Sequence, residues 1–178
     1  MSSEGAMARL FDATVLPHLD AAFNYARWLT RNDAEAEDVV QDACVRALRY
    51  FSSLRDDDAR AWFLAIVRNA WYSRVARHAR VMSMPLLDKF GESPADDALN
   101  PEAQLLQQIT VARVREALDQ LPVDFREVIV LREIEGMSYK AIASVVRVPI
   151  GTVMSRLARG RERLLALLKS EAMVEAVP

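Results

Sequence analysis

The sequence predicts an all-α protein made of two small helical domains joined by a flexible linker, the second domain being a helix-turn-helix. Three observations predict this fold. The chain has 178 residues with only five glycines, and its apolar residues recur at helical spacing without a segment of alternating strand pattern. A stretch rich in proline and acidic residues divides the chain at residues 81–101. Residues 139–163 then give the pattern of a short helix, a tight turn and a second helix.

The first domain is predicted to span residues 7–80 and to contain three helices. The first helix covers residues 7–30, and Pro17 is expected to kink or split it because proline disrupts a helix interior. Asn32 or Asp33 then caps a second helix, since such side chains accept hydrogen bonds from the first free amides of a helix. A polar loop precedes the third helix, residues 59–80, which is dense in aromatic residues and arginine.

The linker, residues 81–101, contains three prolines and one glycine among several acidic residues. This composition is typical of an extended, unpacked connection. At about 3.5 Å per residue, such a segment spans at most about 70 Å. The two domains are therefore expected to be able to contact DNA about two helical turns apart.

The second domain is predicted to span residues 102–170. A helix ends near Gln120, and Pro122 opens another helix over residues 123–133. Gly136 is well placed to end that helix, because glycine adopts the left-handed conformation that many helix ends require.

The helix-turn-helix begins where Ser138 caps a helix over residues 139–146, which residues 147–149 interrupt. The following helix separates two faces. Its apolar face carries Val153, Leu157, Gly160, Leu164 and Leu167. Its opposite face carries hydroxyl and guanidinium groups, which suit phosphates and guanine edges. We call the predicted contact set on that face the duplex-reading residues: Thr152, Ser155, Arg156 and Arg159.

The net charge of −2 by itself argues against a nucleic-acid-binding protein, but the charges are segregated. Residues 33–42 hold five acidic side chains and no basic one, whereas residues 60–80 hold five arginines and no acidic one. Local patches govern binding to a polyanion more than the net charge does. The pattern indicates two DNA contacts, with the acidic segment free for another partner, although acidic residues also simply complement a helix start.

Several classes of function find no support. Cys44 is the only cysteine, so neither an internal disulfide nor a cysteine zinc site is expected, which fits a reducing cytoplasm. No apolar run approaches the about 20 residues needed to span a bilayer, and no secretory signal is visible. There is no glycine-rich phosphate loop, nucleophile elbow or zinc signature, so we expect no enzyme activity, cofactor or metal.

The order of short motifs in both domains resembles that of bacterial sigma factors of the extracytoplasmic-function type. In the first domain the similar stretches are Ala36-Glu-Asp-Val-Val-Gln-Asp42 with its continuation to Arg49, and residues 61–69. In the second domain they are residues 118–122, 126–132, 135–139 and 151–156. Each motif is weak alone, but their joint order across the chain is specific.

The resemblance implies a protein that binds core RNA polymerase, directs it to promoter DNA and helps to open the duplex. It implies that the acidic helix binds the clamp helices of the beta-prime subunit. The positions that match, which we call the polymerase-binding residues, are Asp38, Val39, Gln41 and Asp42.

The resemblance also implies that the first domain recognises the minus-ten element as separated strand, while the duplex-reading residues recognise the minus-thirty-five element. Unpaired bases stack on aromatic rings, and their backbone pairs with arginine. The matching positions are the loop at residues 51–55 and a helix face that we call the strand-capturing residues: Arg68, Asn69, Tyr72 and Arg77. Phe63 is expected in the core, whereas Trp62 and Trp71 fit a core position and a DNA contact equally well.

Two departures from the family pattern affect single contacts. Met154 stands where many relatives carry lysine or arginine, so one DNA contact is in doubt. Lys140 and Ala141 replace a common acidic pair, which removes a capping carboxylate. Because the family is usually held inactive and this chain shows no inhibitory domain, the resemblance also implies an anti-sigma factor as a partner.

Two other functions remain open. One is a stand-alone regulator that binds DNA through the second domain and dimerises through the first. It differs from a sigma factor in binding DNA without polymerase. The other is a sigma mimic that titrates an anti-sigma factor, against which the intact face carrying Arg156 and Arg159 argues.

Overall fold

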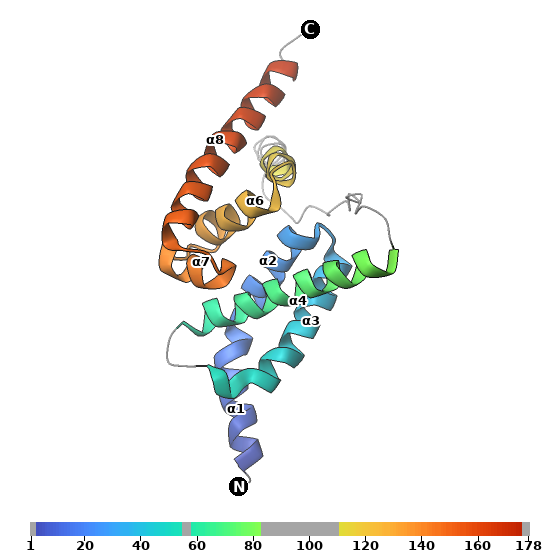
Figure 1. The fold of residues 1–178 in the computed structure, drawn as a ribbon, viewed down its shortest axis with the longest axis vertical. Helices are drawn as coiled ribbons and strands as arrows, with labels where there is room; N and C mark the ends of the chain where they lie inside the picture. The colour runs from blue at the N-terminus through green and yellow to red at the C-terminus, as the bar shows by residue number, and fades with distance from the viewer. Residues whose placement is uncertain (1–2, 55–57, 83–110, 176–178) are drawn as a thin grey trace, which may run out of the picture.

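In a computed structural model of the chain, residues 3–54, 58–82 and 111–175 are described, and their regular elements are all helical (Figure 1). The predicted all-α fold is confirmed for these ranges. The predicted linker, residues 81–101, lies almost entirely outside them, as does the predicted start of the second domain at residue 102.

Three long segments build the first domain. The predicted first helix is split, as Pro17 indicated: α1 covers Ser3–Val15, a 3-10 turn covers Leu16–His18, and α2 covers Leu19–Thr30. Helix α3 covers Asp33–Tyr50 and is capped by the side chain of Asn32, which accepts a hydrogen bond from the Glu35 amide at 2.9 Å. After a second 3-10 turn, Phe51–Ser53, helix α4 covers Ala59–Met82.

The core of the first domain lies where α2, α3 and α4 pack against one another. Alanines on α3 allow this close approach, since their small side chains are completely buried. Phe63 on α4 is completely buried, as predicted, while Trp62 and Trp71 are half-buried at the edge of the core. The inward face of α3 runs through Ala36, Val39, Ala43 and Ala47.

The second domain follows the predicted helix-turn-helix pattern. Residues 111–119 are helical, α6 covers Val123–Ile129 and continues as a π turn over Val130–Ile134, α7 covers Tyr139–Val146 and α8 covers Ile150–Glu175. Gly136 has a positive φ of 64° after the π turn, as expected of a residue that ends a helix. The Ser138 hydroxyl caps α7 by accepting a hydrogen bond from the Ala141 amide at 3.1 Å.

The two domains pack against each other instead of standing apart. Helix α7 packs on α4 and α6 packs on α2, so that residues far apart in the sequence lie side by side (Figure 1). Buried residues of both domains form one continuous hydrophobic cluster. Helix α4 therefore lies between the rest of the first domain and the helix-turn-helix, which decides which of its side chains reach solvent.

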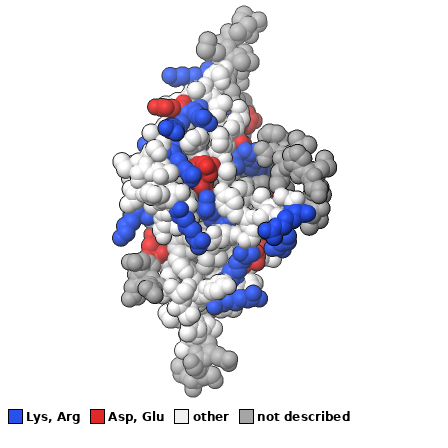
Figure 2. Space-filling view, in the orientation of Figure 1, with Lys and Arg blue, Asp and Glu red and all other residues white. Residues whose placement is uncertain are grey.

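The molecule is elongated, with α1 at one end and the C-terminal part of α8 at the other (Figure 1). Basic side chains lie along α8 and over the C-terminal part of α4, with acidic side chains between them (Figure 2). Within the ranges that the structure describes, no single helix is long and apolar enough to cross a bilayer.

Candidate nucleic-acid interface

Helix α8 is held by its apolar face, which packs on α6. Val153 and Leu157 are buried there, as predicted. Gly160 lets the two helices approach closely, because a Cβ at this position would lie 2.8 Å from Cδ1 of Ile129. This packing directs the opposite face of α8, with the duplex-reading residues, away from the core.

The duplex-reading residues differ in how available they are. Ser155 and Arg159 are exposed, and Arg159 forms no ion pair with the described part of the chain. Thr152 is half-buried. Arg156 is 21% exposed, with Nη2 3.2 Å from Oδ2 of Asp124 and Nη1 3.6 Å from Oε1 of Glu127. Two of the four side chains thus face solvent freely, and one is held by carboxylates of α6.

The side chains of α8 that neighbour the duplex-reading residues are of two kinds: exposed apolar side chains, and arginines that have partners within the second domain. Ile150 and Met154 are exposed at its N-terminal end, so the position whose DNA contact was in doubt carries an exposed apolar side chain. Further along, Nε of Arg161 donates to Glu133 at 3.1 Å, and the Arg163 guanidinium lies 4.8 Å from the centre of the Phe125 ring. These two arginines therefore have partners within their own domain.

The strand-capturing residues do not form one exposed surface. Arg68 is only 14% exposed, because its Nε lies 2.7 Å from Oε2 of Glu127 and its Nη2 lies 3.0 Å from Oε1. The same guanidinium lies 4.5 Å from the centre of the half-buried Tyr72 ring. Asn69 lines a pocket, and Arg77 is exposed near the end of α4. The second domain covers Arg68 in this arrangement, and the assignment of the four residues to the minus-ten strand stays a prediction.

Glu127 on α6 is the centre of a buried polar cluster that the sequence analysis missed. The Tyr25 hydroxyl donates to its Oε2 at 3.3 Å, beside the bidentate contact from Arg68. Burial raises the pKa of Glu127, although the Arg68 contact opposes this, and burial likewise raises the pKa of Tyr25 well above its usual range. The sequence did contain a signal for this cluster. Glu127 lies inside an apolar helical run, and a carboxylate that is buried there requires a partner.

Further ion pairs also join the two domains. The Arg60 guanidinium contacts the Glu135 carboxylate and donates to the Glu135 carbonyl at 2.9 Å. Arg31 contacts Asp119, with Nε 3.7 Å from Oδ1. Because each pair takes its arginine from the first domain and its acid from the second, the domain interface is charge-complementary.

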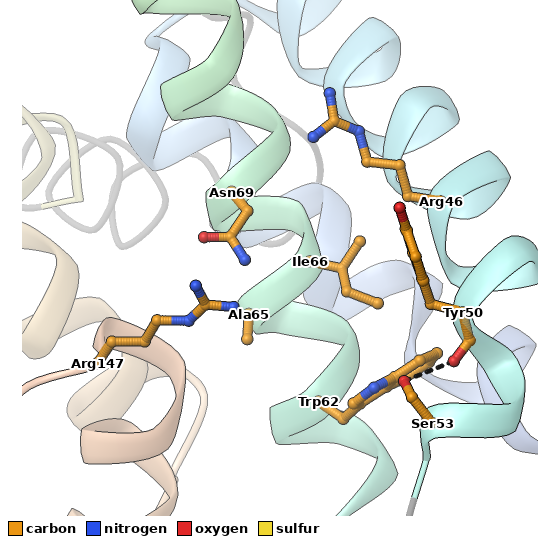
Figure 3. A pocket seen from close by; sticks show the side chains of 8 residues that line it. All are labelled: Arg46, Tyr50, Ser53, Trp62, Ala65, Ile66, Asn69 and Arg147. Atoms are coloured by element: carbon orange, nitrogen blue, oxygen red, sulfur yellow. Dashed lines mark hydrogen bonds between the residues drawn. The ribbon is translucent and has the colours of Figure 1, made fainter.

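A pocket of about 280 Å³ lies between the C-terminal end of α3 and the middle of α4 (Figure 3). Its lining includes aromatic rings, guanidinium groups, a hydroxyl and an amide, which come from Arg46, Tyr50, Ser53, Trp62 and Asn69. Arg147, from the turn between α7 and α8, completes its rim. Such a lining suits an unpaired base with its phosphate. Of the predicted loop, residues 51–54 are described and residue 55 lies outside the described ranges.

The polymerase-binding residues lie on two sides of α3. Asp38 is exposed and 3.0 Å from Arg74, Gln41 is exposed, and Asp42 pairs with Arg46 at 2.8 Å. Val39, however, is completely buried, so its assignment to a partner surface is wrong. Spacing places it on the same face as the buried alanines, whereas Asp38 and Gln41 are turned away from that face.

Two apolar side chains on the exposed side of α3 were missed by the sequence analysis. Val45 and Leu48 are exposed and continue the stripe of Asp38 and Gln41 at helical spacing. The sequence could have indicated that both side chains are exposed, because Val45 and Leu48 do not lie on the helix face that carries the buried alanines. The exposed face of α3 thus combines acidic, amide and apolar groups.

Comparisons with known proteins identify both halves of the chain. The family model "Sigma-70 region 2" matches residues 14–81, and "Sigma-70, region 4" matches residues 112–164. The chain is 34% identical over 154 residues to the ECF RNA polymerase sigma factor SigE of Mycolicibacterium smegmatis, covering 86% of this chain but only 60% of that protein. It is 33% identical over 163 residues to the RNA polymerase sigma-H factor of Pseudomonas aeruginosa, covering 88% and 84%.

A solved structure is similar over nearly the whole chain. The sigma factor RpoE, in complex with the anti-sigma factor NepR from Bartonella quintana, matches with a TM-score of 0.74 and 30% identity. The match covers 89% of this chain and 96% of that one. It therefore extends over both helical domains.

Proposed function

The chain belongs to the extracytoplasmic-function sigma factors, and from this we propose that it binds core RNA polymerase and directs it to promoters, reading the minus-thirty-five element as duplex and the minus-ten element as separated strand. The observation that carries the proposal is the outward polar face of α8, where Ser155 and Arg159 are exposed on a helix that α6 holds in place. A rigid helix with an open polar face is what insertion into a major groove requires.

In the proposed duplex contact, Arg159 reads a base edge and Ser155 and Thr152 contact phosphates. A bidentate arginine–guanine contact contributes about 1–3 kcal/mol of discrimination. Arg156 is held by Asp124 and Glu127, so it takes part in DNA contact only by exchanging a carboxylate for a phosphate or by presenting its remaining donors. Arg159 is therefore the residue to test first.

In the proposed strand contact, the pocket between α3 and α4 receives an unstacked base. Tyr50 and Trp62 offer ring faces, Asn69 and Ser53 offer hydrogen bonds, and Arg46 offers a cation for the backbone. Stacking contributes about 1–3 kcal/mol per base, against a cost of a few kcal/mol for taking a base out of the duplex. Capture of the separated strand thus favours opening of the DNA duplex without hydrolysis of a nucleoside triphosphate.

The proposed polymerase contact is the exposed face of α3. Asp38, Gln41 and Asp42 keep their assignment to the clamp helices, and Val45 and Leu48 replace the buried Val39. An acidic face with two apolar anchors suits a partner helix pair that is basic at its rim and apolar at its centre.

We also propose an anti-sigma partner, because RpoE, the solved relative described above, was captured with one. A pull-down with the tagged full-length protein from its native cells should return a small partner besides the polymerase subunits. Recovery of polymerase alone, in stressed and unstressed cultures, would contradict this part of the proposal.

The experiment that tests the main proposal is run-off transcription on fragmented genomic DNA with core polymerase. Wild-type protein should produce new discrete transcripts. Arg159→Ala should lose them while retaining core binding, and Asp38→Arg should lose core binding. Arg9→Ala, on α1 of the first domain, is the matched control for Arg159→Ala and should transcribe normally.

Three results would redirect the interpretation. Core binding without transcripts would favour a mimic, and DNA binding without core binding would favour a stand-alone regulator. Full activity of Arg159→Ala would show that the wrong helix face has been assigned.

A further inference from the structure

Two acidic side chains of the second domain each hold one arginine of α8. Asp124 lies in the first turn of α6, and its Oδ2 accepts a hydrogen bond from Nη2 of Arg156 at 3.2 Å. Glu133 lies in the π turn that continues α6, and its Oε1 accepts a hydrogen bond from Nε of Arg161 at 3.1 Å. Because α8 packs on α6, both acids approach α8 from the side of its apolar face.

The two held arginines lie on opposite sides of the exposed polar face of α8. One residue turns an α-helix by about 100°, so Arg156 lies about 100° to one side of Ser155. Arg161, six positions after Ser155, lies about 120° to the other side. Between them is Arg159, which is exposed and forms no ion pair within the described ranges. The face thus has a free arginine near its centre and an acid-bound arginine on each side.

The acids of these two pairs are open to solvent. The side chains of Asp124 and Glu133 are 51% and 49% exposed. Glu127 also faces Arg156, with Oε1 3.6 Å from Nη1, but two nitrogens of Arg68 already bind that carboxylate. Exposed ion pairs contribute little to stability. Their main consequence here is therefore that they neutralise cations beside the proposed DNA-reading face.

Neutralised arginines affect binding to different DNA sequences unequally. An arginine that contacts a phosphate releases counterions whatever the sequence, and one that is bound to an acid must first give up that acid. On a promoter, base contacts fix the register of the helix. On other sequences the helix can shift until any free arginine reaches a phosphate. Free arginines on both sides of the face would therefore strengthen non-specific binding more than promoter binding.

We infer that Asp124 and Glu133 determine the specificity of duplex binding, because they withhold Arg156 and Arg161 from phosphates and leave Arg159 free at the centre of the face. The inference rests on the proposed reading of the minus-thirty-five element by α8. It assigns a role in DNA recognition to two carboxylates that need not touch DNA.

The test measures binding of the full-length protein to two fluorescein-labelled duplexes by anisotropy, over a series of salt concentrations. One duplex carries the minus-thirty-five element of a promoter found by run-off transcription, and the other has the same bases in scrambled order. Asp124→Asn combined with Glu133→Gln should bind the scrambled duplex severalfold more tightly than wild type, with a smaller gain on the promoter duplex. The slope of log K against log salt should steepen by about 0.9 for each arginine that gains a phosphate.

A double-mutant cycle separates this effect from plain repulsion between an acid and DNA. If Asp124 acts by holding Arg156, the gain from Asp124→Asn should vanish when it is made in an Arg156→Gln background. The gain from Glu133→Gln should likewise vanish in an Arg161→Gln background. Gains of unchanged size in these backgrounds would overturn the inference, because the acids would then act directly on the DNA.

Two controls are matched to these variants. Glu162 is an exposed acid of α8 that forms no ion pair within the described part of the chain, so Glu162→Gln should give a smaller gain than either acid variant. Asp124→Glu retains the charge and should bind like wild type. An equal gain from Glu162→Gln would contradict the role of the two ion pairs.

Failure of the inference is distinguishable from failure of the proposed function. If the wild-type holoenzyme transcribes from the promoter but the variant lacking both acids binds the scrambled duplex no better than wild type, even at the lowest salt, the inference alone fails. If transcription by the wild-type holoenzyme does not depend on a minus-thirty-five element, the proposed duplex reading fails and the inference fails with it.

Discussion

The two helices assigned to DNA, α4 and α8, hold their arginines in opposite surroundings. Arg68 on α4 is 14% exposed and makes a bidentate contact with the buried Glu127. Arg159 on α8 is exposed and forms no ion pair within the described ranges. The difference arises from the neighbouring helices, since α4 is covered by the second domain and the outer face of α8 is covered by nothing described.

The two proposed DNA contacts therefore require different amounts of rearrangement in the protein. Duplex reading by Arg159 needs no rearrangement of the protein. Strand capture by Arg68 requires the guanidinium to leave a carboxylate, and separating a buried pair is costly. The packed arrangement therefore permits the first contact and opposes the second.

The strongest test of the contrast is to remove the carboxylate at the domain interface. Glu127→Ala leaves Arg68 without its bidentate partner and the Tyr25 hydroxyl without its acceptor. We expect a loss of about 3–5 kcal/mol in the free energy of unfolding, measured by urea denaturation. Glu133→Ala removes the acid of an exposed pair with Arg161 and should cost at most about 1 kcal/mol. Equal losses in the two variants would contradict the buried role of Glu127.

The second test concerns the packing that holds α8 in place. Gly160→Ala puts a Cβ 2.8 Å from Cδ1 of Ile129, so we expect a loss of about 1–3 kcal/mol from overpacking. Gly151→Ala, on the same helix, meets nothing within 4 Å and should stabilise by up to about 1 kcal/mol. Thermal unfolding of both variants checks the prediction. A stabilised Gly160→Ala would show that the close contact between α6 and α8 is absent in solution.

The third test separates binding from stability on the open helix. Arg159→Ala should weaken duplex minus-thirty-five binding by about 1–3 kcal/mol. Its free energy of unfolding should change by no more than about 0.5 kcal/mol, since the side chain is exposed. Fluorescence anisotropy with duplex DNA and urea denaturation measure the two quantities. A large loss of stability with unchanged affinity for duplex DNA would contradict this prediction, because Arg159 would then stabilise the fold, as Arg68 does, and would not bind DNA.

The smallest expected effects come from one helix cap in each domain. Asn32→Ala and Ser138→Ala each remove the acceptor of a capping hydrogen bond and should cost about 1 kcal/mol. Because the buried residues of both domains form one cluster, each variant should shift a single unfolding transition. Asn32→Asp retains the acceptor and should remain close to wild type. Two separate transitions, each sensitive to one cap, would contradict a joint core.

The sequence by itself determined the helices, several of their ends and the two faces of α8. Pro17 predicted the break between α1 and α2, and Asn32 and Ser138 predicted the caps that the structure contains. These features depend on backbone geometry and on neighbours three or four residues away, so a local pattern is sufficient to predict them. The order of motifs in both domains then predicted the family.

Only the tertiary structure decided which charged and apolar side chains reach solvent. Val39 is buried and Arg68 is bound by an acid 59 positions away, while Arg147 reaches a pocket of the other domain. A shift of one position turns a helical side chain by about 100°, so the phase of a single residue is easily misjudged. Burial and ion pairing depend on which helix packs on which, and this is set by the sum of many long-range contacts that no local pattern contains.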